Sequence, residues 1–390
     1  MFIINILRVA KREACDIFSD KLYRTILLWL PIAMILFFTL MFYRGVIYDL
    51  PVVVVDRDNS LLSRKLISMI DATPGVNTSY QVSSIDDAMT MFQDGKAYGV
   101  VYIDDGFEAG IYRGVTVGIE CFVSGTNISA SGVVERDVQQ VVRTFSAGVS
   151  MEKLETMGVS HDQAFIEVMP VNIQTNIVGN PYLNYGYYLA PIFMIMGVII
   201  FTMLSTVYSV GRELHYATSV SWLERSGGSI GVALCGKLMP ITITMFVLMQ
   251  MLYLILFVFM GMECAGSYLM LTLVSLCFII AYQSVAVLVI TLTANLRLAL
   301  SLAGGYAVMA FTFSGITFPT IAMFGVARVL SKCFPMTYFS EIFISQAMRG
   351  APLKYDIVPM IMLLLFILML PISLKRLKVV SLNSRYWKRD

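Results

Sequence analysis

The chain has 390 residues, of which 57% are hydrophobic and only 14% are charged. A soluble domain carries about 25% charged residues, so the composition argues against an ordinary soluble protein and indicates one embedded in a bilayer. The formal net charge is +2, which gives no sign of a nucleic-acid-binding surface. The six cysteines are scattered and form no CxxC pair, so a disulfide framework and a zinc site are both unexpected.

Residues 1–24 precede the first long apolar run and have the spacing of an amphipathic helix. One face of this helix is apolar and the opposite face is basic, with Ile3, Leu7, Ala10, Ala14 and Ile17 on the first and Arg8 and Arg12 on the second. The pattern predicts a helix that lies in the plane of the membrane interface. A solvated cytoplasmic helix is the alternative that this pattern leaves open.

Six apolar runs approach membrane-spanning length. A hydrocarbon core about 30 Å thick requires roughly 20 apolar residues in a helix, and we predict spans at about 25–43, 188–209, 239–261, 268–291, 298–318 and 357–374. None of these runs contains Asp, Glu, Lys, Arg or His, which argues against coupling to protons or sodium. The six runs predict an all-α polytopic membrane domain.

The distribution of basic residues orients these spans. Lys and Arg gather before residue 25 and in and just before the tail 377–390. By the positive-inside rule, both termini are expected in the cytoplasm. The segment 319–356 opposes this arrangement because it carries basic residues on the expected outer side.

The segment 44–186 separates the first two spans and has the pattern of alternating strands and helices. Strands are predicted at 51–55, 79–82, 98–103 and 115–122, and helices at 60–71, 84–92 and 105–112. A long helix at about 127–157 and another strand at 165–173 follow. The β-α-β-α-β order predicts an inserted extracytoplasmic α/β domain.

The insert offers no convincing catalytic or metal site. Its conspicuous carboxylates stand at predicted strand ends, where such side chains cap helices and form turns, at Asp56, Asp58, Asp104 and Asp105. His161 is its only histidine and has no Cys or His near it in the sequence. We therefore expect no metal, no cofactor and no enzymatic activity in this chain.

Residues 231–238, GVALCGKL, nearly spell a phosphate-binding P-loop. The motif requires Ser or Thr at its last position, where this chain has Leu238. No strand is predicted before it, and the residues after it enter a span. Any ATP-dependent step would therefore require a separate partner.

Three short motifs follow the second predicted span, GRELHYAT at 211–218, WLER at 222–225 and GKLMP at 236–240, and the last runs into the third span. Their order resembles the permeases of ABC type-2 transporters, in which an Arg-Glu-rich stretch ends one span and Gly-Lys opens the next. The family usually has Gly where this chain has Ala217, and it has a Pro that residues 226–229 lack.

Other segments extend the resemblance to nearly the whole chain. NP at 180–181, FSGITFP at 313–319 and FPMTY at 334–338 resemble family motifs at the corresponding spans. The insert resembles the external domain of the subgroup associated with drug and small-molecule export. The resemblance implies the permease subunit of an ABC-type exporter in a bacterial inner membrane, with an amphipathic or hydrophobic substrate that is drug-like or envelope-related.

The resemblance also implies two functional regions. A cytoplasmic coupling loop is implied at 211–237, with the ATPase-coupling residues Arg212, Glu213, Thr218, Trp222, Glu224 and Arg225. An external re-entrant region is implied at 319–356, and the pathway or gate residues would be Phe313, Ser314, Gly315, Phe318, Pro319, Phe334, Pro335 and Tyr338. An ordinary loop with snorkelling charges and an interfacial aromatic belt are the alternatives.

The partners implied for such a subunit are an ABC ATPase that binds ATP and Mg, a second permease subunit in a homo- or heterodimer, and membrane lipid. A periplasmic adaptor protein is a further candidate, and no nucleic acid is expected. A different reading remains open: a non-transporting membrane receptor or envelope assembly factor whose external domain binds a ligand. A stable complex with an ATPase would favour the exporter.

Overall fold

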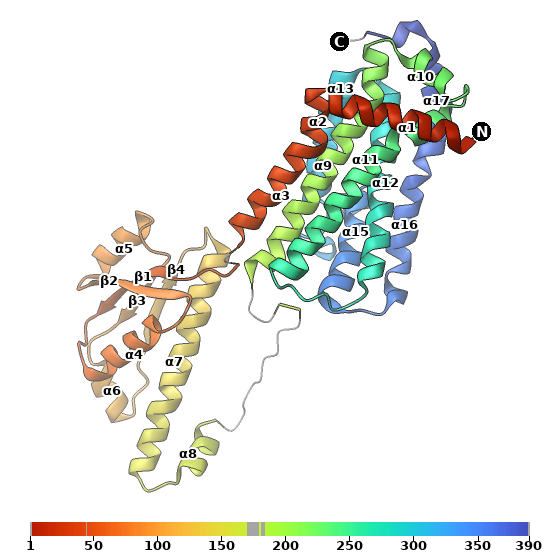
Figure 1. The fold of residues 1–390 in the computed structure, drawn as a ribbon. Coiled ribbons are helices and arrows are strands. Elements are labelled where there is room, and N and C mark those ends of the chain that lie inside the picture. Colours follow the sequence, from red (N-terminus) through yellow and green to blue (C-terminus); the bar gives the residue numbers. More distant parts are fainter. Residues whose placement is uncertain (1, 44, 170–178, 181–183, 389–390) are drawn as a thin grey trace. The chain divides into compact units, whose positions relative to one another are not determined.

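The computed structural model describes residues 2–43, 45–169, 179–180 and 184–388. The chain divides into two compact units, shown in Figure 1. The membrane unit comprises Met1–Gly45 and Ile177–Asp390, and the insert unit comprises Val46–Asn176.

The membrane unit is helical in its described residues. It begins with α1 (Phe2–Ser19), α2 (Lys21–Arg24), a π-helical segment (Thr25–Trp29) and α3 (Leu30–Met41). After the insert come α9 (Tyr185–His215), α10 (Ser219–Arg225), α11 (Ile230–Leu254), α12 (Tyr268–Thr293) and α13 (Leu296–Thr312). The last helices are α14 (Gly325–Ser331), α15 (Pro335–Phe343), α16 (Ile357–Ile367) and α17 (Met369–Leu382).

Among the described residues, 5 helices are long and apolar enough to cross a membrane. They are Lys21–Met41, Gly186–His215, Ile230–Phe259, Tyr268–Thr293 and Ile357–Leu382, and each overlaps a predicted span. The span predicted at 298–318 corresponds to α13, which ends at Thr312 and has only 17 residues. At 1.5 Å per residue such a helix covers about 25 Å, less than a typical bilayer core, so a sixth crossing stays a prediction.

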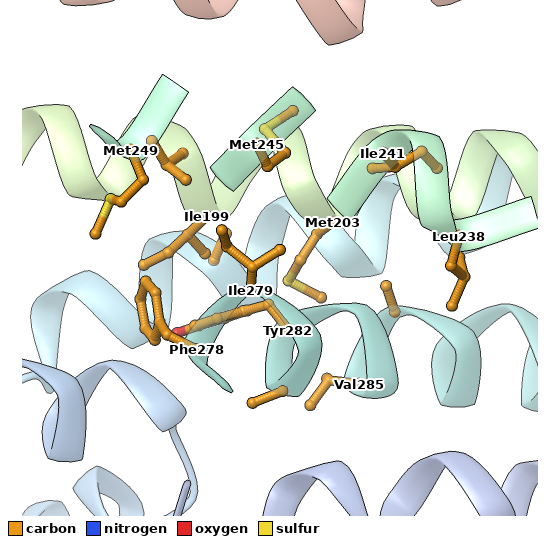
Figure 2. Close-up of a cluster of buried hydrophobic side chains, with 14 of the residues drawn as sticks. Ile199, Met203, Leu238, Ile241, Met245, Met249, Phe278, Ile279, Tyr282 and Val285 are labelled. Atoms are coloured by element: carbon orange, nitrogen blue, oxygen red, sulfur yellow. The ribbon is translucent and has the colours of Figure 1, made fainter. Parts of the chain in front are cut away.

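Helix α9 lies at the centre of the membrane unit, between α3, α11, α12 and α13. Figure 2 shows its side chains Ile199 and Met203 packed among those of α11 and α12. The face of α13 that is buried in the unit carries only alanines, at Ala299, Ala303, Ala307 and Ala310. Small side chains at this spacing allow two helical backbones to approach closely, which explains how so short a helix packs firmly.

The insert unit contains one sheet of four strands. These are β1 (Leu50–Asp56), β2 (Val76–Val82), β3 (Gly99–Ile103) and β4 (Ile119–Val123), in the order β2-β1-β3-β4. β1 runs parallel to β2 and β3, and β4 runs antiparallel to β3. The helices are α4 (Leu61–Asp71), α5 (Ile85–Gln93), α6 (Phe107–Arg113), α7 (Ile128–Thr156) and α8 (His161–Val168).

The valine run of β1 is buried on both faces of this sheet. Val52 and Val54 pack in the cluster that includes α4 and α7, whereas Val53 and Val55 pack beside Ala88 of α5. Alternate residues of a strand point to opposite faces, so an uninterrupted apolar run is the pattern of a central strand. The first part of the insert therefore folds as its sequence predicts.

The prediction of a strand at 165–173 is wrong for residues 165–168, which are helical. Helix α8 runs from His161 to Val168, and residues 170–173 lie outside the described residues. Ser160 precedes this helix and Asp162 stands in its first turn, where a carboxylate interacts favourably with the helix dipole. These N-terminal signals outweigh the apolar, β-branched composition that suggested a strand.

The aspartates at the strand ends have structural roles where their contacts are defined. The Asp56 carboxylate accepts hydrogen bonds from the backbone N–H groups of Asp58 and Asn59. Asp58 accepts one from the N–H of Glu108 in the first turn of α6, at 3.1 Å. Burial raises the pKa of Asp58, but hydrogen bonds from Ser60 and from α6 backbone amides outweigh it and hold the pKa below its ordinary value.

Candidate functional site

The connection between α9 and α11 is shorter than the loop predicted at 211–237. Helix α9 continues to His215 and α11 begins at Ile230, so only residues 216–229 connect them. This link contains α10, and its second residue, Ala217, is left-handed at φ 56°. Glycine adopts that conformation more easily than alanine does, which gives a physical reason for the Gly that ABC type-2 permeases usually have here.

Helix α10 is held against the ends of α9 and α11. The Ser219 hydroxyl donates to the Glu213 carbonyl at 2.9 Å, and the Thr218 hydroxyl donates to the Glu213 carboxylate. The Trp222 ring is buried, and its indole N–H donates to the Ala233 carbonyl at 3.2 Å. The buried face of α10 is therefore bonded to both long helices.

A buried ammonium group lies at the centre of this end of the unit. Lys237 of α11 places its Nζ 2.6 Å from a Glu13 carboxylate oxygen and 2.8 Å from one of Glu213. Each of these three side chains is only 1% exposed. Isolated charges are costly to bury, so the lysine and the two glutamates depend on one another. The ammonium also lies 5.5 Å from the centre of the Trp222 ring.

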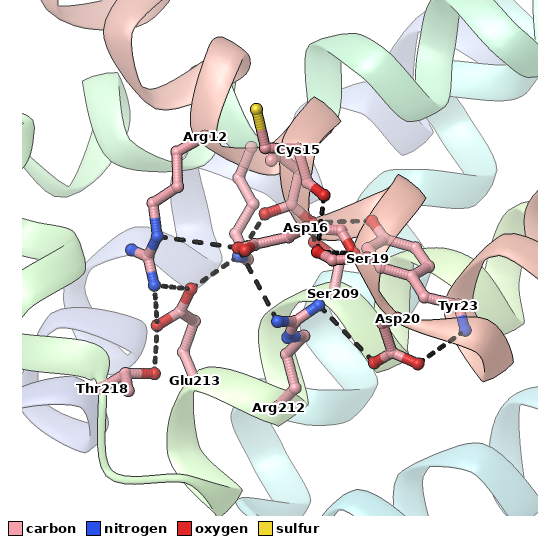
Figure 3. A network of polar contacts seen from close by, with 12 residues as sticks. Arg12, Cys15, Asp16, Ser19, Asp20, Tyr23, Ser209, Arg212, Glu213 and Thr218 are labelled. Carbon is pink, nitrogen blue, oxygen red and sulfur yellow. Dashed lines mark hydrogen bonds and ion pairs between the residues drawn. The ribbon is translucent and has the colours of Figure 1, made fainter.

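Further groups complete this arrangement, which we call the charge cluster (Figure 3). The Tyr23 and Ser209 hydroxyls donate to Glu13 at 2.7 and 2.6 Å. Arg12 lies 3.1 Å from the Glu213 carboxylate. Together with Lys237, Arg12 gives two positive charges for two buried glutamates, so this half of the cluster is electrically balanced.

The other half of the charge cluster joins α9 to the end of α1. Arg212 lies 3.7 Å from both Asp16 and Asp20. The Tyr208 hydroxyl donates to Asp20 at 2.7 Å. Burial raises the pKa of Asp20, but the Tyr208 hydrogen bond, backbone amides and Arg212 outweigh it and lower the pKa.

Oxygen atoms of Glu13, Asp16 and Glu213 lie within 4.8 Å of one another, close enough to share a metal ion. The Lys237 ammonium already contacts two of these carboxylates at hydrogen-bonding distance. A fixed positive charge therefore occupies the position that a cation would take, and we assign no metal to the charge cluster.

A glycine brings α1 close enough to α11 for these contacts. A Cβ atom added at Gly236 would lie 2.7 Å from the Ile6 carbonyl oxygen and from the Val9 Cβ atom. Real Cβ atoms do not approach other atoms so closely, so any larger residue would force α1 away from α11. Gly236 and Lys237 thus act together: one admits α1, and the other neutralises Glu13 on it.

The structure separates the predicted coupling residues into two groups. Arg212, Glu213, Thr218 and Trp222 are internal: their side chains belong to the charge cluster or pack beside it. Glu224 and Arg225 are exposed on α10 and form no ion pair within the described part of the chain. Only the second group is free to contact another protein.

The charged residues of α9 and α11 lie in helical turns beyond the spans predicted at 188–209 and 239–261. Both helices are longer than the predicted spans and include Arg212, Glu213 and Lys237. Glu13 was also missed, although it stands four residues from both Val9 and Ile17 on the buried face of α1. A carboxylate in such an apolar row signals a buried partner.

The sequence 231–238 that nearly spells a P-loop lies within α11, and its lysine, Lys237, is the one paired in the charge cluster.

Some of the predicted gate residues meet at the end of α13. The rings of Phe313 and Phe334 are stacked with centroids 6.1 Å apart, and Tyr306 lies 5.0 Å from Phe334. Ser314 is buried, and its carbonyl accepts a hydrogen bond from Ser340 at 3.0 Å. These contacts fasten α15, which begins at Pro335, to the end of α13.

The remaining gate residues lie apart from this aromatic group. Phe318 is 53% exposed and Pro319 is exposed. Tyr338 donates to the Lys332 carbonyl at 3.1 Å. Gly315 has φ 85°, and a Cβ there would meet Thr320 at 2.7 Å, so the turn after α13 requires glycine. The re-entrant arrangement implied for 319–356 corresponds to α14 and α15, and whether they enter the bilayer stays a prediction.

A family model described as ABC-2 family transporter protein matches residues 21–374. The chain belongs to the ABC-2 transporter family. No curated protein and no solved structure matches it significantly. The match covers four of the five candidate spans, most of the fifth and the link that contains α10, so the chain is a membrane permease of this family. ABC-2 membership implies partnership with an ABC ATPase.

Proposed function

We propose that the chain is the permease subunit of an ABC-type exporter and that a separate ATPase subunit drives it. Two permease subunits, identical or related, would form the membrane pathway with two ATPase subunits. ATP and Mg would bind to the ATPases, and this chain would carry out no hydrolysis itself. An amphipathic or hydrophobic substrate is the best fit to a membrane unit whose long helices are mostly apolar.

The observation that carries this proposal is the position of α10. Its buried side chains contact the charge cluster, while Glu224 and Arg225 project away from the unit. A short helix that is anchored on one side and charged on the other is suited to fit a groove on a partner. We place the ATPase on this side, which makes the α1 end of the membrane unit cytoplasmic.

The charge cluster supplies a physical route for transmission. A displacement of α10 would act on Glu213 through Thr218 and Ser219, and from Glu213 on Lys237 and Glu13. These residues belong to α9, α11 and α1, so the three helices would shift together. Packed interfaces rearrange between discrete states rather than deforming continuously, as a change from inward to outward access requires.

The test is to reconstitute the permease with its ATPase and to measure substrate-stimulated ATP turnover. Reversal of the exposed charge in Arg225→Glu should abolish stimulation and leave thermal stability unchanged, because no described contact within the chain is lost. Glu213→Ala should lower both stimulation and stability. Lys65→Glu, at an exposed lysine of the insert unit, is the matched control for charge reversal.

If Arg225→Glu and Glu224→Lys, each tested alone, both leave the stimulation of ATP turnover normal, the proposed docking of α10 is refuted. Co-purification separates the exporter from a receptor: a stably bound ATPase supports transport, and its repeated absence supports the receptor.

A further inference from the structure

Helix α1 has a second apolar face besides the one that packs on α11. Val9, Glu13 and Ile17 are buried against the unit, whereas Ile3, Leu7 and Phe18 are 70%, 54% and 63% exposed. The exposed apolar face is part of the one that the sequence predicts for an interfacial helix. A helix that docks on its own protein with one face and leaves an adjacent face apolar still has a surface available to lipid.

This second face forms one wall of a groove of about 440 Å³. The wall on α1 includes Leu7 and Ala14, and the π-helical segment contributes Leu28. Met239 and Ile243 of α11 form the opposite wall. The groove begins where the two helices diverge, because α1 touches α11 at Gly236 and the lining residues of α11 follow after it.

The lining of the groove is almost entirely apolar. Pro240 stands in the wall on α11, and proline has no backbone N–H to offer a ligand. Thr244 and Lys11 carry the only side-chain polar atoms among the lining residues. Such a lining suits a hydrocarbon chain, because a polar ligand would lose its hydrogen bonds to water without replacement.

The charges of α1 are sorted between its faces. The acidic residues Glu13 and Asp16, together with Asp20 just after the helix, all face the charge cluster, where Lys237 and the arginines engage them. Lys11 is exposed at the groove, and Arg8 is exposed one turn before it. Neither forms an ion pair within the described residues. The free charge beside the apolar groove is therefore positive.

We infer that this groove binds an acyl chain of an anionic phospholipid, with Lys11 and Arg8 holding the headgroup phosphate. The apolar wall accounts for the chain, and the two unpaired cations account for the negative headgroup. A basic side chain at the edge of an apolar surface can extend toward the headgroup region while its stem stays on the hydrocarbon. This inference rests on α1, α11 and the π-helical segment, and it does not depend on the proposed transport.

The test is native mass spectrometry of the purified full chain, titrated with phosphatidylglycerol or phosphatidylcholine of identical acyl chains. The parent should retain phosphatidylglycerol more tightly. Lys11→Glu should reduce this preference by about fivefold or more, since one basic residue near a headgroup contributes ~1 kcal/mol. Ala14→Phe, which fills the groove, should weaken both lipids. Cys15→Phe, one residue away and exposed, should bind like the parent.

Ile243→Phe provides a second obstruction from the opposite wall, in case Ala14→Phe disturbs folding. Lipid binding by both filled variants equal to that of the parent would overturn the inference. Glycerol phosphate that binds as tightly as phosphatidylglycerol would show a headgroup site without an acyl groove, which overturns it too. A filled variant that keeps its lipid but loses dimer mass would instead identify the groove as a contact between two copies.

Discussion

Replacement of Lys237 by methionine is the most direct test of the charge cluster. Methionine keeps most of the volume and apolar surface of the lysine side chain but removes its charge. Glu13 and Glu213 would then face each other in the interior without the ammonium between them. Arg12 lies 3.1 Å from Glu213 and would still neutralise that carboxylate, so the unpaired charge is that of Glu13.

The size of the effect follows from the geometry. Carboxylate oxygens of Glu13 and Glu213 lie within 4.8 Å of one another. At an effective dielectric constant of about 20, two like charges at that distance repel by about 3.5 kcal/mol, which is an upper limit here because Arg12, 3.1 Å from Glu213, offsets part of the repulsion. Removal of one partner from a buried ion pair typically costs about 3–5 kcal/mol, which agrees. For a unit of this size, such a loss lowers Tm by roughly 10 °C.

Thermal unfolding of the purified protein in detergent, followed by static light scattering, measures this shift. Lys65→Met, at an exposed lysine of the insert unit, is the control and should unfold with the parent. The double variant Lys237→Met with Glu13→Gln should recover most of the loss, because it restores charge balance with the Arg12–Glu213 pair. A Tm of Lys237→Met equal to that of the parent would refute the reasoning. A double variant as unstable as the single one would show that packing, rather than charge, is lost.

Three further outcomes are expected. Gly236→Ala should loosen α1 at a cost of about 1–3 kcal/mol, seen as faster hydrogen exchange in α1. Gly231→Ala should not, because its added Cβ would make only an ordinary contact, 3.9 Å from a Leu374 methyl group. Equal exchange in the two variants would contradict the close crossing. Ala217→Gly should raise the free energy of unfolding by about 1 kcal/mol, because it relieves a left-handed alanine, and an unchanged value in thermal unfolding would contradict that strain. Asp58→Asn should speed hydrogen exchange in α6 at neutral pH. The lowered pKa of Asp58 means that this stabilisation is present above the ordinary carboxyl pKa of roughly 4 and is lost as the pH falls through the folded-state value. The exchange rates of the parent and of Asp58→Asn should therefore become equal in acid. A difference that persists there would refute the capping role.

The sequence predicts those features that local patterns determine. Long apolar runs identify the five candidate spans, and the valines of β1 identify a central strand. The run at 165–168 shows the limit of composition, because Phe165 and Val168 favour strands but lie in α8, behind the N-terminal signals at Ser160 and Asp162. Hydropathy alone could not decide between strand and helix for residues 165–168.

The candidate site depends on contacts between distant parts of the chain, which periodicity does not reveal. The resemblance pointed to Arg212 and Glu213 as groups for a partner, but both are engaged inside the protein by residues of α1 or α11. Their exposure depends on where α1 docks, and that depends on Gly236 and Lys237 together. Glu224 and Arg225 are exposed on α10, and their contact with an ATPase stays a prediction.

The order of synthesis gives the charge cluster a consequence for biogenesis. Glu13 leaves the ribosome 224 residues before Lys237, a delay of roughly 11–45 s at ordinary rates of translation. During that time α1 has neither its neutralising lysine nor its docking glycine, and its apolar face is free to hold it at the bilayer surface. Helix α1 is therefore synthesised well before it can take its place, and a nascent chain that stops before α11 carries Glu13 without the Lys237 ammonium that neutralises it.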